Sequence, residues 1–252
     1  MWEDKVREVI DKYQPDLIWF DSRLSIIPES SRQRMCAHYY NQAREGNQEV
    51  LVNDRYGEGS RGIHGDVYNV EYHYGIESEG LLTHKWSYWR GVGNTYGYNR
   101  DMNPEDCLTV KELIDMVVNG MSRNGNFDIN VGPTAEGLIS DVEREPLIAL
   151  GRWLEVNGEA VYGTRPWRIT EEGDIRFTAK GDYVYAIFLK WQGESFRITS
   201  VNPVEGSSIT MLGVESPLAW RRDGDGIVID YPLYRSRPAQ CSYAWAFKIR
   251  IK

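Results

Sequence analysis

The sequence changes its pattern near residue 165, and this change constrains the fold more than any other feature. Before it, segments with apolar residues at helical spacing alternate with short, nearly all-apolar runs at 16–20, 49–52 and 127–131. Capping boxes at Thr109–Glu112 and Ser140–Glu143 mark the starts of two helical segments. Buried strands that alternate with helices indicate a parallel sheet covered by helices, either an open doubly wound sheet or a (β/α) barrel.

After about residue 169 the sequence consists of short β-type runs separated by turns rich in Gly, Pro, Asn and Asp, with clear examples at 183–189, 227–229 and 244–249. Such a succession is typical of a small antiparallel β-sandwich. We therefore predict two domains, an α/β domain over residues 1–163 and a β-sandwich over residues 164–252.

The composition excludes several classes of protein. The formal net charge is −8, with 29 basic and 37 acidic residues, and no basic run could neutralise phosphates. We therefore expect no nucleic acid and no anionic membrane surface as a partner. The apolar runs are far shorter than the about 20 residues of a membrane-spanning helix, and the first residues do not resemble a signal peptide. The compartment stays open.

Disulfide and metal chemistry have weak support. The 3 cysteines are few, odd in number and far apart, and the only closely spaced histidines, His64 and His73, have no cysteine near them. The sequence also contains no Gly-x-Ser-x-Gly elbow, phosphate-binding loop or complete dinucleotide fingerprint. We expect no metal ion and no organic cofactor.

Aromatic residues make up 12% of the chain, with 9 Trp and 16 Tyr against 6 Phe. Tyr and Trp combine a flat apolar face with a polar group, which suits an amphipathic ligand such as a sugar. Most of these side chains are equally well explained as ordinary core residues. The composition therefore permits a sugar-binding groove without requiring one.

Polar residues follow the predicted strands. Asp21 comes directly after Trp19 and Phe20, the second strand ends in 53–55, and Glu71 follows in a segment of β-type alternation. In parallel α/β folds the carboxyl ends of the strands build the site, because their loops converge on one mouth. Apolar surroundings desolvate a carboxylate at a strand end, which costs free energy, so such a residue usually has an ion-pair partner or a functional role. Asp21 could also cap a turn or pair with Arg23.

Two carboxylic acids at such a mouth would suit glycoside hydrolysis, which needs a nucleophile and a general acid. An apolar environment could raise the pKa of Glu71 toward the acid role. Asp66, Glu77 and Glu79 lie close to Glu71 in the sequence, and any of these acids could be a solvated surface charge.

Five motifs resemble, in order, those of the α-L-fucosidases of glycoside hydrolase family 29: 13–21 (YQPDLIWFD), 52–57 (VNDRYG), 96–100 (YGYNR), 126–133 (NFDINVGP) and 156–167 (VNGEAVYGTRPW). The β-rich end of the chain resembles the carboxyl-terminal sandwich of that family. The resemblance covers essentially the whole chain.

The resemblance implies roles for individual residues. Asp21 matches the nucleophile that forms a covalent fucosyl-enzyme intermediate. Trp19 and Arg55 match residues that contact the sugar, and Tyr96 matches an aromatic residue that lines the pocket near the fucose methyl group. We expect the substrate to be a fucosylated oligosaccharide or glycoconjugate.

The general acid/base of the family occurs in two contexts. Bacterial members commonly have it in a Glu-Tyr-His sequence, which matches 71–73 here, so the resemblance implies Glu71 as acid/base, with His73 beside it among the substrate-binding residues. Animal-type members have it directly after a Lys-Trp pair, and here that pair is followed by Ser87. A serine cannot act as a general acid at neutral pH, which favours Glu71.

The length implies a partial structure. A (β/α)₈ barrel typically needs about 250 residues, and about 160 precede the sandwich here. We therefore expect the second half of a TIM-type barrel followed by the β-sandwich. An open half-barrel exposes apolar strand edges, so we expect a homo-oligomer or an association that completes the barrel.

Three functional hypotheses follow. The first is a retaining exo-α-L-fucosidase that hydrolyses terminal α-L-fucosyl linkages through Asp21 and Glu71. The second is a catalytically silent fucosidase-like fragment that binds sugar weakly or only self-associates. The third makes the β-sandwich an independent carbohydrate-binding module, which requires Trp191, Trp220 and Trp245 to line one exposed face.

Overall fold

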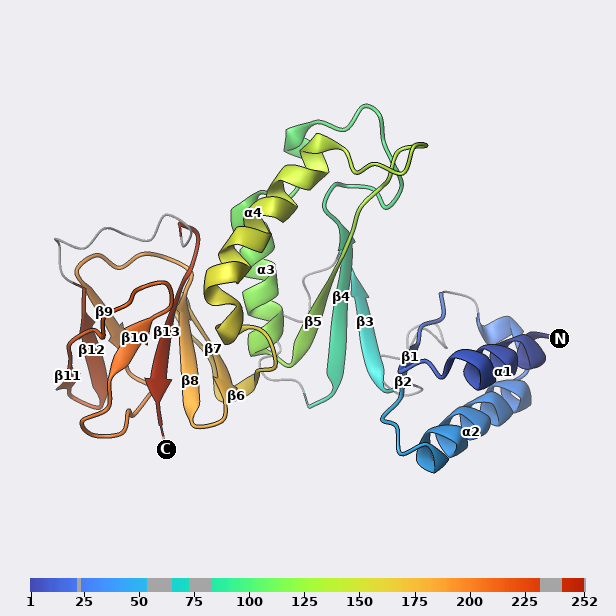
Figure 1. The fold of residues 1–252 in the computed structure, drawn as a ribbon, viewed down its shortest axis with the longest axis horizontal. Coiled ribbons are helices and arrows are strands. Elements are labelled where there is room, and N and C mark those ends of the chain that lie inside the picture. Colours follow the sequence, from blue (N-terminus) through green and yellow to red (C-terminus); the bar gives the residue numbers. More distant parts are fainter. Residues whose placement is uncertain (22–23, 54–64, 73–82, 232–241, 252) are drawn as a thin grey trace. The chain divides into compact units, whose positions relative to one another are not determined.

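The computed structural model describes residues 1–21, 24–53, 65–72, 83–231 and 242–251 (Figure 1). The chain forms two compact units. Unit 1 comprises Met1–Glu71 and His84–Ser87, and unit 2 comprises Tyr72–Thr83 and Tyr88–Lys252. In the described ranges, no helix has the length and apolar character that crossing a membrane requires.

Unit 1 repeats a helix followed by a short strand. Its elements are α1 (Trp2–Tyr13), β1 (Leu17–Ile18), the 3₁₀ helix η1 (Leu24–Ile26), α2 (Glu29–Glu45), β2 (Leu51–Val52) and β3 (Val67–Glu71). Strands β1 and β2 are parallel, with Ile18 opposite Val52, and a parallel bridge joins Asn53 to Val67. This alternation confirms the α/β pattern predicted from the sequence.

The core of unit 1 explains why these segments fold together. Helix α1 ends because Gln14 takes a left-handed conformation (φ 45°) just before Pro15, which turns the chain into β1. The apolar faces of α1 and α2 then cover the two strands. Ile10, Met35 and Val52 are buried in the resulting cluster.

Unit 2 begins with a second α/β region. It contains most of β4 (Lys85–Gly91), followed by the 3₁₀ helix η2 (Pro104–Asp106), α3 (Val110–Ser122), β5 (Gly125–Asn130), α4 (Asp141–Asn157) and the 3₁₀ helix η3 (Gly158–Ala160). Strands β4 and β5 are neighbours in a sheet.

The two predicted capping boxes differ in the structure. Thr109 forms a complete one, because its hydroxyl accepts from the Glu112 amide and Glu112 accepts from the Thr109 amide. Ser140 precedes α4, but its hydroxyl donates to Glu143 and does not cap the backbone. Glu143 is buried and accepts instead from the Gly132 amide at 3.2 Å. This glutamate therefore ties the start of α4 to the segment after β5.

The rest of unit 2 is an antiparallel β-sandwich. Its strands are β6 (Arg165–Glu172), β7 (Ile175–Lys180), β8 (Tyr183–Phe188), β9 (Ser195–Ile198), β10 (Ile209–Met211), β11 (Trp220–Asp223), β12 (Gly226–Asp230) and β13 (Trp245–Arg250). The strand orders are β10-β13-β8-β7-β6 and β11-β12-β9. Phe196 from the smaller sheet packs against Phe188 and Phe247 from the larger one, with ring centroids 4.9 and 4.7 Å apart.

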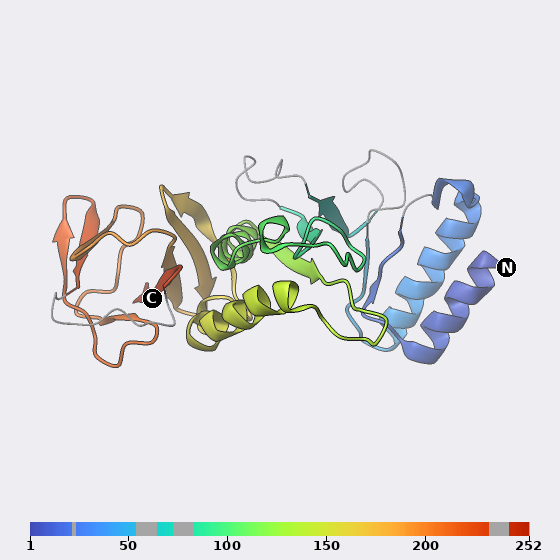
Figure 2. The ribbon, with the colours of Figure 1, turned by 90° about the horizontal axis from the view of Figure 1, so that it is seen from above.

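The larger sheet is covered on both faces. Phe188 and the other even-numbered residues of β8 face the smaller sheet, whereas Tyr185 and Ile187 pack with α3 and α4. Figures 1 and 2 show these helices beside β6, β7 and β8. Double coverage explains why the run 183–189 is apolar throughout, although strands with one solvated face alternate.

The three tryptophans of the carbohydrate-module hypothesis do not form an exposed face. Trp245 is only 6% exposed, and Trp191 packs edge-on against it with ring centroids 5.1 Å apart. Trp220 packs against the same core and donates its indole N–H to the Ser207 carbonyl. Their contacts are those of sandwich core residues, so that requirement is not met.

Glu159 connects η3 to the sheet and gives a test by pH. Its carboxylate accepts from Lys248 Nζ at 2.6 Å and from the Tyr185 hydroxyl at 2.8 Å. The hydrogen bond from Lys248 lowers the pKa of Glu159, and that from Tyr185 adds to the effect. A carboxyl group with a lowered folded-state pKa stabilises the fold above its unfolded pKa of about 4.3, and this contribution is lost as the pH falls further.

We expect Glu159→Gln to reduce the loss of stability on acidification. Urea unfolding midpoints measured between about pH 6 and pH 3 should fall less steeply for the variant than for the parent chain. Glu155→Gln, an exposed change on α4, is the matched control and should follow the parent. Parallel curves for parent and Glu159→Gln would rule out this linkage.

Candidate active site

The predicted nucleophile lies where expected, beyond the carboxyl end of β1. The segment Trp19-Phe20-Asp21 continues from β1 without regular pairing, and Asp21 is exposed. The Phe20 ring packs on Trp2 of α1, with ring centroids 5.6 Å apart. The packing of Phe20 on Trp2 thus anchors the segment, while Asp21, its last residue, is exposed to solvent.

Asn53 holds this segment from the neighbouring strand. The Phe20 amide donates to Asn53 Oδ1 at 2.9 Å, and Asn53 Nδ2 donates to the Phe20 carbonyl at 2.8 Å. Asn53 is 0% exposed, so its amide needs both partners. The sequence shows Asn53 only as part of a polar strand end and carries no signal for its pairing with Phe20.

Trp19 is oriented by a second asparagine. Its indole N–H donates to Asn69 Oδ1 at 2.7 Å. Asn69 lies on β3 two residues before Glu71, so the two side chains leave the strand on the same face. The structure therefore places the predicted sugar-contacting indole against the face of β3 that carries Glu71. Nothing in the sequence pattern singled out Asn69.

Tyr96 belongs to an aromatic cluster in unit 2. Its ring meets the Tyr72 ring edge-on at 5.1 Å, and its hydroxyl donates to the Trp89 carbonyl at 3.2 Å. The Arg90 guanidinium lies over the Tyr72 ring at 5.3 Å. The Tyr72 hydroxyl also accepts from the Gly91 amide at 3.1 Å. Tyr96 is thus held in place while its side chain stays partly exposed.

Tyr72 has a strained backbone, which the sequence did not indicate. Its φ is 49°, a left-handed value that is rare for an aromatic residue. Such strain persists only where the surroundings fix the chain. Here the contacts with Tyr96, Arg90 and Gly91 fix the residue that directly follows Glu71.

Two predicted substrate-binding residues, Arg55 and His73, lie outside the described residues. Ser87, which occupies the position after Lys85-Trp86, is buried within β4. Within the described ranges, no group of three or more His, Cys, Asp or Glu side chains is arranged to hold a metal ion.

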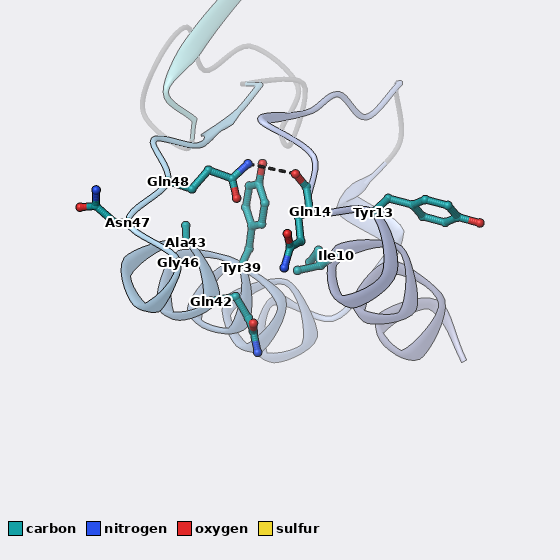
Figure 3. A pocket seen from close by; sticks show the side chains of 9 residues that line it. All are labelled: Ile10, Tyr13, Gln14, Tyr39, Gln42, Ala43, Gly46, Asn47 and Gln48. Atoms are coloured by element: carbon teal, nitrogen blue, oxygen red, sulfur yellow. Dashed lines mark hydrogen bonds between the residues drawn. The ribbon is translucent and has the colours of Figure 1, made fainter.

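A separate pocket of about 420 Å³ lies at the other end of the unit 1 strands (Figure 3). The ends of α1 and α2 and the segments that lead into β1 and β2 form it. Gln48 Nε2 donates to the Gln14 carbonyl at 2.9 Å, and the Tyr39 hydroxyl donates to the Pro15 carbonyl at 2.6 Å. Burial raises the pKa of Tyr39 to about 12. Because Asp21 follows β1 whereas this pocket precedes it, the pocket is not part of the candidate active site.

The fold and site define a class: an α/β region with a carboxylate at a strand end, followed by a β-sandwich. Known proteins share this arrangement. A family model described as Alpha-L-fucosidase matches residues 1–159, and one described as Alpha-L-fucosidase C-terminal domain matches residues 169–250. The chain therefore belongs to the alpha-L-fucosidase family.

Individual relatives agree with the family models. The chain is 36% identical to the tissue alpha-L-fucosidase of Homo sapiens over 251 residues, which cover 96% of this chain and 53% of that protein. It is 32% identical to an alpha-L-fucosidase of Branchiostoma floridae, with 96% and 55% covered. The chain thus spans about half the length of the curated relatives it matches.

Solved structures confirm the fold. The Thermotoga maritima alpha-fucosidase in complex with a mechanism-based inhibitor superposes with a TM-score of 0.77 and 30% identity, over 99% of this chain and 56% of that one. Another alpha-L-fucosidase gives a TM-score of 0.79 at 31% identity. The predicted partial fucosidase barrel with a carboxyl-terminal β domain is therefore confirmed.

Proposed function

We propose that this chain carries the chemistry of a retaining exo-α-L-fucosidase, acting on terminal α-L-fucosyl linkages of oligosaccharides or glycoconjugates. The observation that carries the proposal is the exposed Asp21 at the end of β1, in a member of the alpha-L-fucosidase family. Trp19, fixed by Asn69 against the face of β3 that carries Glu71, supports the same assignment.

The reaction takes two steps. The Asp21 carboxylate attacks the anomeric carbon, the bond to the leaving oxygen breaks, and Glu71 gives its proton to that oxygen. A water molecule then attacks the anomeric carbon of the fucosyl ester, Glu71 takes a proton from the water, and the Asp21 carboxylate is released. Two displacements at one carbon retain its configuration, and neither step uses a metal ion or an organic cofactor.

The other proposed residues bind the sugar. Trp19 offers the face of its indole to the C–H groups of the ring. Tyr96 lines the position of the fucose methyl group, in line with the resemblance. Arg55 and His73, which lie outside the described residues, would bind the polar groups of the substrate.

Turnover of an aryl α-L-fucoside by the purified chain tests the function. We expect hydrolysis, with α-L-fucose as the first product seen by proton NMR. β-L-fucose as the first product would contradict retention. Because the chain spans about half of its relatives, a folded chain that binds fucose without hydrolysing it would instead support the silent fucosidase-like fragment.

We also propose that the chain associates through the open edge of its short parallel sheet. In the described part of unit 1, β1 pairs with β2 along one edge and has no strand on the other, and Leu17 of β1 is 44% exposed. An exposed strand edge is a template for pairing with another chain. A second copy, or a polypeptide carrying the remaining barrel strands, would cover it.

Light scattering tests this association. We expect a solution mass at least twice the 29.1 kDa of the chain, because pairing at the edge buries apolar surface. Leu17→Lys should shift the mass toward that of the monomer, and Leu138→Lys, an equally apolar exposed position in unit 2, should not. A monomer at all concentrations would contradict self-association.

A further inference from the structure

We propose that Asn53 is a positioning residue for the reaction, which aims the Asp21 carboxylate by holding both backbone polar groups of Phe20. The proposal rests on the proposed role of Asp21 as nucleophile. It assigns a function to a residue that acts through the backbone of Phe20 and takes no part in the bond making or proton transfer of the proposed scheme.

The side chain of Asn53 extends the strand pairing beyond the point where β1 ends. The last backbone bond of the β1–β2 ladder runs from the Asn53 amide to the Ile18 carbonyl at 3.2 Å. In an extended chain, residues two apart present their N–H and C=O groups to the same edge. Phe20 therefore faces β2 as Ile18 does, and the Asn53 side chain binds both of its backbone groups.

This contact fixes two successive peptide planes with one amide. The Phe20 N–H belongs to the plane that joins Trp19 to Phe20. The Phe20 carbonyl belongs to the plane that joins Phe20 to Asp21. With both held, at 2.9 and 2.8 Å, the direction in which the Asp21 side chain leaves the chain is set. Strand β1 ends at Ile18, before Asp21. The two hydrogen bonds from the Asn53 side chain therefore hold the chain where backbone pairing has ended.

An amide is the side chain that suits this task. It donates through Nδ2 and accepts through Oδ1 at the same time, matching the N–H and C=O of one residue. A carboxylate could accept from the Phe20 amide but would repel the Phe20 carbonyl. Because Asn53 is fully buried, water cannot replace a lost bond, and the segment must shift to satisfy its polar groups.

We expect Asn53→Ala to lower kcat about 10- to 100-fold with little change in KM, because displacing a reacting group by about 1 Å costs roughly that much. Asn157→Ala is the matched control. Asn157 is also 0% exposed and donates to the Trp153 carbonyl at 3.2 Å, but it lies at the end of α4 in unit 2. The Asn157→Ala change should lower the stability of the fold and leave kcat unchanged.

Asn53→Asp gives a signature that a merely structural role would not produce. When ionised, the introduced carboxyl lacks the donor for the Phe20 carbonyl. When protonated, it regains one. The ratio of variant to parent kcat should therefore rise toward acid pH. Division by the parent rate at each pH removes the pH dependence that parent and variant share.

The possible outcomes separate the two proposals. Equal kcat in Asn53→Ala and Asn157→Ala, or a ratio for Asn53→Asp that does not change with pH, would overturn the role of Asn53 while leaving the fucosidase assignment intact. An inactive parent chain would instead contradict the proposed function. In that case hydrogen exchange tests the contact between Asn53 and the Phe20 backbone. Asn53→Ala should speed exchange of the Phe20 amide, and Asn157→Ala should not. Unchanged exchange would overturn it.

Discussion

Asp21→Ala is expected to lower the hydrolysis of an aryl α-L-fucoside by at least about 1,000-fold, which corresponds to about 4 kcal/mol of lost transition-state stabilisation. The variant keeps the fold, because Asp21 is exposed and the Asn53 bonds go to Phe20. The variant lacks the carboxylate that attacks the anomeric carbon, so no covalent intermediate forms. Steady-state rates and circular dichroism of parent and variant measure the two effects separately.

The control for this variant lies at the other end of the same strand. Asp16 precedes β1 and accepts from Gln48 Nε2 at 2.8 Å, away from the proposed reaction. Asp16→Asn should keep the parent rate. Azide added to Asp21→Gly should restore part of the turnover and give fucosyl azide of inverted configuration, because the small anion replaces the missing carboxylate in a single displacement. Full activity of Asp21→Ala would exclude the assignment.

Trp153→Ala is expected to destabilise unit 2 by about 3–5 kcal/mol. Trp153 is fully buried between α4 and the larger sheet, and its indole N–H donates to the Ala244 carbonyl at 2.9 Å. The change leaves a large cavity in a cluster that joins the helices to the sandwich, and it removes the indole donor from that carbonyl. Trp153→Phe keeps an aromatic ring but loses the hydrogen bond, so its stability should lie between those of the parent chain and Trp153→Ala.

Urea unfolding followed by circular dichroism measures this loss. Ile148→Ala, on the same helix but 42% exposed, is the control and should change the unfolding free energy by less than about 1 kcal/mol. If Trp153→Ala unfolds at the same urea concentration as Ile148→Ala, the helix layer does not depend on this contact and the account of the unit 2 core is wrong.

Much of the architecture could be predicted because its signals are local and strong. The helical period before 16–20 and 127–131, the Thr109 capping box and the turn-rich β runs after residue 169 each depend on neighbouring residues. The burial of β8 on both faces was not predicted, because the helices α3 and α4 that cover its second face lie in a different part of the sequence. The capping box predicted at Ser140 does not form, because Glu143 accepts instead from the Gly132 amide. That contact depends on the tertiary fold and not on neighbouring residues.

The site was predictable in part. Asp21 follows an apolar run, a pattern visible in the sequence, and in the structure it lies beyond β1 and is exposed. The contacts that hold this strand end were not visible, because Asn53 and Phe20 are 33 residues apart and Trp19 and Asn69 are 50 apart. Tyr72 likewise has no sequence signal for its left-handed backbone. The roles of Asp21 and Glu71 stay predictions.

Covalent trapping tests the central claim most directly. An activated fucoside whose 2-hydroxyl is replaced by fluorine forms the ester quickly and hydrolyses it slowly, because fluorine disfavours the oxocarbenium-like transition state and the departing group is already activated. Incubation with the chain, digestion and mass spectrometry should place one fluorofucosyl group on Asp21, in the peptide that contains Trp19 and Phe20. A label on another carboxylate, or none on a chain that hydrolyses the ordinary substrate, would contradict the account.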